Sequence, residues 1–433
     1  MAPSDAHMIN DIMADISASP SPFHVVETVA SALAAEGFVG VNDHEPWPTE
    51  HGGFYLRRNG AIVAWAHQGQ PAEAGFRIIG AHTDSPNLRL KPQPGTSKVG
   101  LAQVGVEVYG GVLLNSWLDR ELGLSGRVVV RDGDDQKGVL VHTDDPLFVI
   151  PQLAIHLDRE ISTTGLLLNK QQHMAPIGGF AGSDDAKGAP EQPLALIAEL
   201  ADVDPADVLS HELMLHDVRP PQIYGYRKNL LAAPRIDNQL SCFVAQRVLT
   251  ATAETPDSVP MIALFDHEEV GSTSASGAGS PLLASVLERS VSARGGDHGA
   301  FRRAIANSLL VSADGAHATH PNYADRHEPD HQIALNAGPV LKYNANERYA
   351  TTAETAAAFR RACDRAGVPV QEFVTRTDLA CGSTIGPISA AELGMATVDV
   401  GCPQLAMHSA RETCGTDDAA MFHAALVELF TNP

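Results

Sequence analysis

The stretch RIIGAHTDSPNLRLKP, residues 77–92, decides the fold because an apolar run in it ends directly in polar residues. The run from Arg77 to Ala81 predicts a short buried strand. His82, Thr83 and Asp84 follow that run immediately. In open α/β sheets, ligands bind beyond the carboxyl ends of the strands. We therefore expect an α/β protein in which His82 ends a strand and lies beside the functional site.

Four other positions place a carboxylate or an imidazole at the end of an apolar strand or at the start of a helix. They are Asp237 at the start of an apolar helix, Glu268-Glu269 after Met261 to Phe265, Asp314 after Leu309 to Ser312, and His408 in the loop beyond Val398 to Val400. Each of these residues has an ordinary role when taken alone, since an Asp that opens a helix is usually an N-cap. Their combination points to one site.

The donor chemistry of these five positions suits a pair of zinc ions. Zinc accepts imidazole nitrogen and carboxylate oxygen, and one carboxylate can bridge two metals. Cysteine, which structural zinc sites usually recruit, is missing from all five positions. Glu268 and Glu269 are adjacent and project differently, so one can ligate metal while the other faces the metal-bound water. These features predict an open, catalytic metal site.

The remaining sequence predicts how the chain is organised. Two helices are expected before Gly37, separated by Pro20-Ser21-Pro22. The middle of the chain has alternating valines and a hairpin pattern around Asp132-Gly133. We predict one α/β domain from residues 1–91 and 231–433, interrupted by a β-rich insertion at 92–230. Within the insertion, we expect Gly178 to Pro193 to form a mobile loop.

The composition narrows the class of protein and its compartment. Among 433 residues, 52 acidic and 30 basic side chains give a formal net charge of −22, which disfavours nucleic-acid and membrane partners. The start of the chain lacks a signal-peptide pattern, and no segment has the roughly 18 apolar residues that span a bilayer. Five widely spaced cysteines indicate no disulfide framework. We expect a cytoplasmic enzyme.

Several strings of this sequence resemble those of the aspartyl aminopeptidases, a family of dizinc exopeptidases. The strings are HTDSPNLRLKP (82–92), RIDNQLS (235–241), DHEEVGS (266–272), HPNYADRHE (320–328), NANERYAT (344–351), CGSTIGP (381–387) and MHSARE (407–412). They occur in order over nearly the whole chain. The resemblance implies a zinc-exopeptidase-like α/β/α catalytic domain with an inserted β-rich dimerisation domain.

The resemblance also assigns roles to individual residues. It implies two Zn²⁺ per chain, replaceable by Co²⁺ or Mn²⁺, with Asp237 bridging them, Glu268 as general base and Asp84 orienting the His82 imidazole. The implied metal ligands are His82, Asp237, Glu269, Asp314 and His408. His267 departs from the family pattern, in which Asn or a similar small polar residue is expected, but the paired glutamates are intact.

Three further residues match the family's substrate site. His156 matches a histidine that reaches the active site of a neighbouring subunit and supports the scissile carbonyl, and a role as metal ligand is the alternative. His317 and Lys342 match residues near the substrate pocket, with Lys342 as countercharge to an acidic first residue of the peptide. Self-assembly of dimers into a dodecamer is also implied.

Other readings of the same residues stay open at this point. Relatives with a preference for neutral first residues exist, and the metal set alone also suits a dizinc deacylase or carboxypeptidase on the same core. The size of the insertion and the string at 344–351 favour an aminopeptidase. A catalytically silent scaffold is disfavoured because Glu268 and all five ligands are intact.

Overall fold

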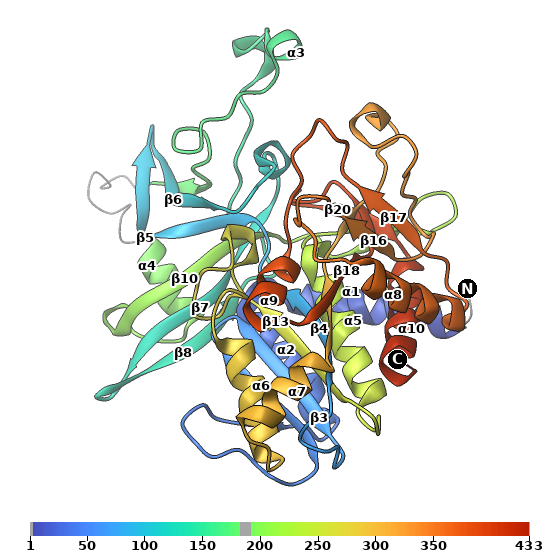
Figure 1. Ribbon diagram of the computed structural model, residues 1–433. Helices are drawn as coiled ribbons and strands as arrows, with labels where there is room; N and C mark the ends of the chain where they lie inside the picture. The colour runs from blue at the N-terminus through green and yellow to red at the C-terminus, as the bar shows by residue number, and fades with distance from the viewer. Residues whose placement is uncertain (1–2, 182–191, 433) are drawn as a thin grey trace. The chain divides into compact units, whose positions relative to one another are not determined.

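The computed structural model describes residues 3–181 and 192–432 (Figure 1). The chain forms two compact units, one from Met1–Asp84, Pro221–Met407 and Glu412–Pro433, the other from Ser85–Pro220 and His408–Arg411. The sequence predicted these boundaries after residues 91 and 230. They lie 7 and 10 residues later than the boundaries in the structure, which follow residues 84 and 220 (91 − 84 = 7 and 230 − 220 = 10). It did not separate 408–411 from the catalytic part. Most of the loop expected to be mobile, Gly178 to Pro193, lies outside the described residues.

The first unit is built on a nine-stranded mixed sheet in the order β1-β2-β3-β13-β4-β14-β18-β16-β17. The strands are β1 (Val39–Gly40), β2 (Gly52–Arg58), β3 (Ala61–His67), β4 (Phe76–His82), β13 (Val259–Phe265), β14 (Leu309–Ala313), β16 (Val340–Tyr343), β17 (Gln371–Val374) and β18 (Ala396–Gly401). The four neighbours β13, β4, β14 and β18 are parallel. Phe265 pairs with His82, so these strands end at one edge of the sheet.

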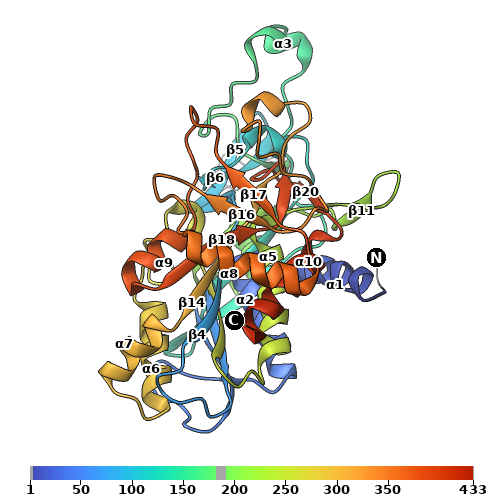
Figure 2. The same cartoon turned by 45° about the vertical axis from the view of Figure 1, so that its right-hand side comes forward.

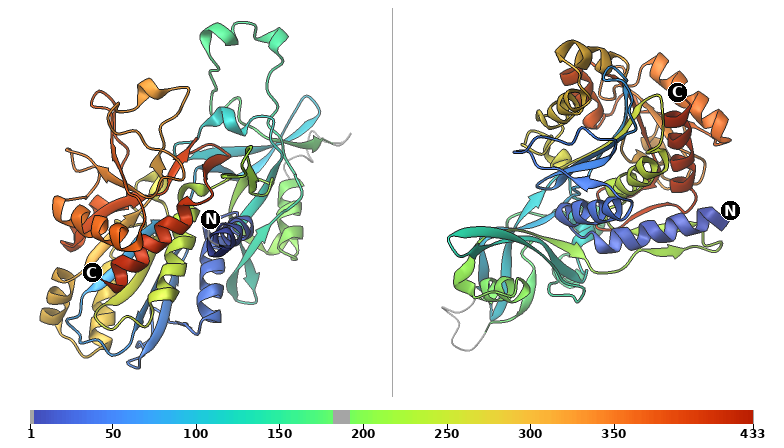
Figure 3. Two further views of the ribbon diagram at one scale, coloured as in Figure 1. Left: turned by 90° about the vertical axis from the view of Figure 1, so that its right-hand side faces the viewer. Right: turned by 90° about the horizontal axis from the view of Figure 1, so that it is seen from below.

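Helices cover both faces of this sheet, which confirms the predicted α/β/α layers. The helices are α1 (Pro3–Ala18), α2 (Pro22–Ala35), α5 (Ile236–Thr252), α6 (Leu282–Ala293), α7 (His298–Ala306), α8 (Ala353–Ala366), α9 (Ile385–Leu393) and α10 (Asp418–Thr431). Ile79 belongs to a core cluster that also contains residues of α1, α2, α5, α8 and α10, whereas its neighbour Ile78 belongs to a second cluster with residues of α6, α7 and α9. Figure 2 shows the two helix layers on either side of β4 and β14, and Figure 3 shows α1, α5 and α10 side by side.

A smaller five-stranded sheet completes the first unit. Its order is β11 (Gln222–Tyr224), β12 (Leu230–Ala233), β20 (Glu412–Gly415), β19 (Pro403–Leu405) and β15 (Ala316–His317). β12 is followed closely by α5, and β15 follows β14 closely. This sheet therefore carries residues that adjoin the strand ends of the large sheet.

The second unit is a six-stranded antiparallel sheet in the order β8-β7-β10-β5-β6-β9. Its elements are β5 (Asn87–Lys98), β6 (Leu101–Tyr109), β7 (Leu122–Asp132), β8 (Asp135–His142), β9 (Ile177–Phe180), β10 (Val208–Asp217) and the helices α3 (Ile161–Thr164) and α4 (Gln192–Leu200). Asp132 pairs with Asp135 across the β7–β8 turn, which confirms the predicted hairpin. Among the described residues, no helix is both long enough and apolar enough to span a membrane.

Candidate metal centre

The strand ends of the large sheet bring three of the five predicted positions together. His82 is the last residue of β4, and Thr83 donates its N–H to the carbonyl of Phe265 at 2.8 Å. Glu268 and Glu269 begin the short turn η4 (Glu268–Val270) that follows β13. Asp314 comes directly after β14. These side chains share one edge because their strands are parallel neighbours.

The backbone at the start of α5 positions Asp237. Asp237 and Asn238 have non-helical backbone angles and are joined by a cis peptide bond. The Asp237 N–H donates to the carboxylate of Glu412 at 2.9 Å. The amide of Asn238 donates to the carbonyl of Ala313 at 2.7 Å, beside Asp314. The beginning of α5 is therefore held between β20 and the end of β14.

The side chains form one compact, buried cluster around His82. The His82 Nε2 atom lies 3.3 Å from Asp237 Oδ1, 3.8 Å from Asp314 Oδ2 and 3.9 Å from Glu268 Oε2. His82, Asp237 and Glu269 also offer ligand atoms that all lie within 4.8 Å of one another. The structure thus brings together four of the five predicted metal ligands and the predicted base.

Asp84 contacts more groups than the sequence suggested. Its carbonyl oxygen is 2.9 Å from His82 Nδ1 and its carboxylate is 3.4 Å from the same atom. The carboxylate also accepts the backbone N–H groups of Glu268 and Glu269, at 3.1 and 3.2 Å. Asp84 therefore links the imidazole on β4 to the two glutamates that follow β13.

Burial and like charges shape the electrostatics of the cluster. Burial raises the pKa of Glu268 to about 8; the charge of His82 opposes this rise, and the carboxylates of Asp314 and Asp237 add to it. Burial also raises the pKa of Glu269 well above its ordinary value. Burial lowers the pKa of His82, but hydrogen bonds to neighbouring carboxylates, Asp237 first, outweigh it and raise that pKa well above its ordinary value. A divalent cation would relieve this crowding of buried carboxylates.

The donor set and its spacing fit zinc. Two ligand atoms at about 2.0–2.2 Å from one tetrahedral zinc are roughly 3.3–3.6 Å apart. The distances from His82 Nε2 to Asp237 (3.3 Å) and to Asp314 (3.8 Å) lie close to that range. All donors in the cluster are imidazole nitrogens or carboxylate oxygens, and the nearest thiol, Cys242, directs its Sγ to the carbonyl of His82 instead.

Lys342 lies at the side of the cluster that Asp314 occupies, and His317 follows Asp314 closely in the sequence. Lys342, on β16, is only 3% exposed, and its Nζ is 3.4 Å from Asp314 Oδ1. The same Nζ is 5.4 Å from the centre of the Tyr349 ring. His317 ends β15, is exposed, and its ring is 6.0 Å from that of Phe373.

Two predicted residues belong to the second unit, so their place at the cluster stays a prediction. His408 Nδ1 lies 3.1 Å from the carbonyl of Gly111, and the N–H of Leu113 donates to the His408 carbonyl. His156 is exposed on the short turn η2 (Ile155–Leu157). Both the His82 and the His408 rings direct Nδ1 to a backbone carbonyl, a contact in which Nδ1 carries a proton, so that Nε2 is the atom left to bind a cation.

Two buried carboxylates with structural roles near the cluster were missed by the sequence reasoning. Glu412 is 2% exposed and holds the Asp237 backbone, although it ends the quoted string MHSARE. Asp399 on β18 accepts from the N–H of Ala350 at 2.6 Å and the hydroxyl of Thr384 at 2.5 Å. The only signal for Asp399 was its position within the apolar run 397–400.

Comparison with known proteins gives matches over nearly the whole chain. The family model described as "Aminopeptidase I zinc metalloprotease (M18)" matches residues 16–430. A protein of Mycobacterium leprae named "Probable M18 family aminopeptidase 2" is 50% identical over 425 residues, covering 97% of this chain and 98% of that protein. The structure described as "Cryo-EM structure of the Ape4 and Nbr1 complex" superposes with a TM-score of 0.94 at 36% identity, covering 100% of this chain and 87% of that one. For "Structure of S. cerevesiae mApe1 dodecamer" the TM-score is 0.85 at 30% identity, with 99% and 97% covered.

Proposed function

This chain belongs to the M18 family of zinc metalloproteases and is an aminopeptidase, and from that premise we propose that it holds two zinc ions and prefers peptides with an acidic first residue. The observation that carries the proposal is the buried cluster in which His82 Nε2 faces Asp237, Asp314 and Glu268 within 3.9 Å. Bound cations would offset the repulsion among these buried carboxylates.

The two ions would be held by the imidazoles and carboxylates already named. The holding residues are His82, Asp237 as the bridge, Glu269, Asp314 and His408. The Nδ1 contacts of His82 and His408 with backbone carbonyls support this, since they orient Nε2 as the ligand atom. When bound, zinc acidifies a water molecule and polarises a carbonyl group, and Co²⁺ or Mn²⁺ would substitute for it.

The chain's own residues would carry the proton and position the reacting groups. Glu268 takes the proton of the attacking water and returns it to the leaving amine, because it lies at the edge of the ligand cluster rather than at its centre. Asp84 fixes His82 and the backbone of both glutamates through the contacts described above. His156 would support the scissile carbonyl from a neighbouring subunit.

The preference for an acidic first residue rests on Lys342, with His317 near the same pocket. Lys342 is a buried ammonium group, and a carboxylate of the substrate would share it with Asp314. A preference for neutral residues is the competing proposal, because Asp314 already partly neutralises Lys342.

Assembly and compartment are proposed from separate observations. One solved relative is described as a dodecamer, and we propose dimers that assemble into a dodecamer here as well. The five cysteines are all free thiols, four of them buried, which supports the reducing cytoplasm as the compartment.

One experiment tests the metal count and the specificity together. The purified protein is stripped with a chelator, reloaded with Zn²⁺, Co²⁺ or Mn²⁺, analysed for metal per chain, and assayed on Asp, Glu, Leu and Ala aminoacyl substrates. We expect two ions per chain and the highest kcat/KM for Asp or Glu. One ion per chain in fully active protein contradicts the dizinc site, and a higher kcat/KM for Leu or Ala contradicts the acidic preference.

A further inference from the structure

The second unit contains a basic cavity that has no part in the proposed catalysis. This cavity of about 650 Å³ lies beside the hairpin of β5 and β6 and the turn at 170–175. β5 shifts register against β6 between Leu90 and Gly95, and Lys91 lies in this irregular stretch. We call it the lysine cavity, and the lining residues that matter are Lys91, Thr96, Lys98, Lys170, Gln172 and His173.

The positive charge of the lysine cavity stands out against the rest of the chain. The sequence has seven lysines and a net charge of −22, yet three of the seven lysines line this one cavity. Among the described residues that line it, there is no Asp or Glu. In the described part of the chain, none of these three ammonium groups forms an ion pair, and Lys91 Nζ donates only to Gln171 Oε1, at 3.2 Å. The three charges therefore remain to attract an anion.

The turn that carries Lys170 and His173 is ordered by its own hydrogen bonds. The Asn169 side chain accepts the N–H groups of Gln171 and Gln172, at 2.9 and 3.0 Å. The N–H of Asn169 donates to His173 Nδ1 at 3.0 Å. Because Nδ1 accepts, a neutral His173 ring carries its proton on Nε2, which is then a donor. The cavity is thus lined by ammonium, imidazole, hydroxyl and amide donors.

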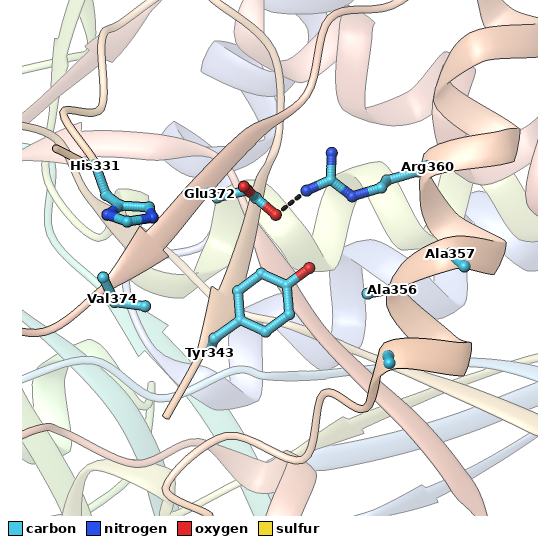
Figure 4. A pocket seen from close by; sticks show the side chains of 8 residues that line it. His331, Tyr343, Ala356, Ala357, Arg360, Glu372 and Val374 are labelled. Atoms are coloured by element: carbon cyan, nitrogen blue, oxygen red, sulfur yellow. Dashed lines mark ion pairs between the residues drawn. The ribbon is translucent and has the colours of Figure 1, made fainter. Parts of the chain in front are cut away.

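A pocket in the first unit provides a contrast. In the pocket of Figure 4, beside β17 and α8, the cation Arg360 points at Glu372 and forms an ion pair with it, among Tyr343, Ala356 and Val374. The charges there cancel. Among the described residues that line the lysine cavity, no carboxylate neutralises a lysine.

We propose that the lysine cavity binds a small soluble anion that carries several phosphate groups, of the size of a di- or triphosphate. Lysine binds phosphate as a point charge, whereas paired recognition of a carboxylate favours arginine, and the cavity has no arginine. Its volume falls within the roughly 300–1,000 Å³ of small-molecule sites. Gly105 contributes to this space, since a Cβ there would lie 3.4 Å from Lys91 Cδ.

The test is calorimetric titration of the zinc-loaded protein with inorganic triphosphate at low salt. We expect saturable binding that weakens at least tenfold in the double variant Lys98→Gln/Lys170→Gln, and also in Gly105→Leu, which keeps every lysine but fills the space. Lys137→Gln, on β8 of the same unit and outside the cavity, is the matched control and should bind as the wild type does. Triphosphate also binds zinc, and the heat of zinc extraction is expected to be the same background in the wild type and the three variants.

Two outcomes overturn the proposal. Equal affinity of the wild type and the double variant shows that the lysines bind no phosphate. Hexaglutamate that binds as tightly as triphosphate, with the same loss in Gly105→Leu, shows that the cavity takes an acidic peptide segment instead. We also expect that none of these substitutions changes the rate of hydrolysis of an aminoacyl substrate. Failure of this test therefore leaves the catalytic proposal untouched, and the reverse also holds.

Discussion

Glu268 is the carboxylate of the cluster for which we propose the most specific chemical role, that of general base. It lies 3.9 Å from His82 Nε2, and its side chain retains 16% exposure. Replacing Glu268 by Gln preserves the shape but removes the base, and general-base catalysis contributes about 10²- to 10⁴-fold. We expect kcat to fall by that factor with zinc content unchanged, measured by steady-state kinetics and metal analysis. Glu354→Gln on α8 is the control, and near-normal kcat with full zinc would remove Glu268 from the mechanism.

The second prediction for a single residue concerns Lys342 and the preference for an acidic first residue of the substrate. Lys342→Met keeps most of the buried stem volume but removes the ammonium beside Asp314. We expect kcat/KM for Asp and Glu substrates to fall by at least tenfold more than kcat/KM for Leu substrates. The ratio of the two values is the measurement, because a general loss of folding or metal lowers both equally. An unchanged ratio would place the determinant of specificity elsewhere.

At the scale of an element, Asp418 couples the start of α10 to pH. Its Oδ2 accepts the N–H groups of Asn336 and Gly415, both at 3.0 Å. Burial raises the pKa of Asp418 to about 7 from an ordinary value of 3.8, in spite of these hydrogen bonds. The folded state therefore binds this proton more firmly than the unfolded state does. The contribution of Asp418 to the free energy of unfolding is largest below about pH 4 and falls as the pH rises from there to about 7. Above about pH 7 the folded state bears the full cost of burying the Asp418 charge.

Asp418→Asn tests this sign, because an amide oxygen can accept the same N–H groups without a charge to bury. We expect the melting temperature of the variant to gain on that of the wild type between pH 5 and about pH 7, and the difference to level off above that pH. Calorimetry at several pH values is the measurement, with Asp417→Asn as control. Parallel profiles of the wild type and Asp418→Asn would contradict the raised pKa.

At the scale of the whole molecule, the segment around His156 is notable for its exposed apolar side chains. Three apolar side chains beside it, Leu153, Ile155 and Leu157, are 63%, 55% and 75% exposed. A run of exposed leucine and isoleucine is typical of a surface that a protein partner covers. This observation supports the proposal that His156 acts in the active site of a neighbouring subunit.

Complementation between two variants tests that proposal. His156→Ala and Glu268→Gln proteins should each be nearly inactive alone. A mixed dimer, isolated with two different tags, contains one site with both Glu268 and the partner's His156 intact. We expect such dimers to recover up to about half of the wild-type kcat per dimer, in the way that shared active sites behave. Verified mixed dimers without activity would assign His156 a role in its own subunit or a structural one.

The sequence by itself determined several of the strands and helices and the chemical groups that stand at their ends. Apolar runs predicted β4, β13 and β14, and the residues that follow them became His82, Glu268 and Asp314 in the cluster. This was possible because hydrophobic periodicity and the residue that ends a strand are local properties of the chain. The parallel order of strands then follows from the α/β pattern.

Only the tertiary structure decided how these groups contact one another. The bond from Asp237 to Glu412 joins residues 175 positions apart, and those from Asp84 to the glutamates span 184 and 185 positions. The assignment of residues 408–411 to the unit of the insertion is likewise a matter of spatial contacts. No local pattern encodes such pairs, because their energy comes from burying and bonding groups that meet only after the sheet has formed.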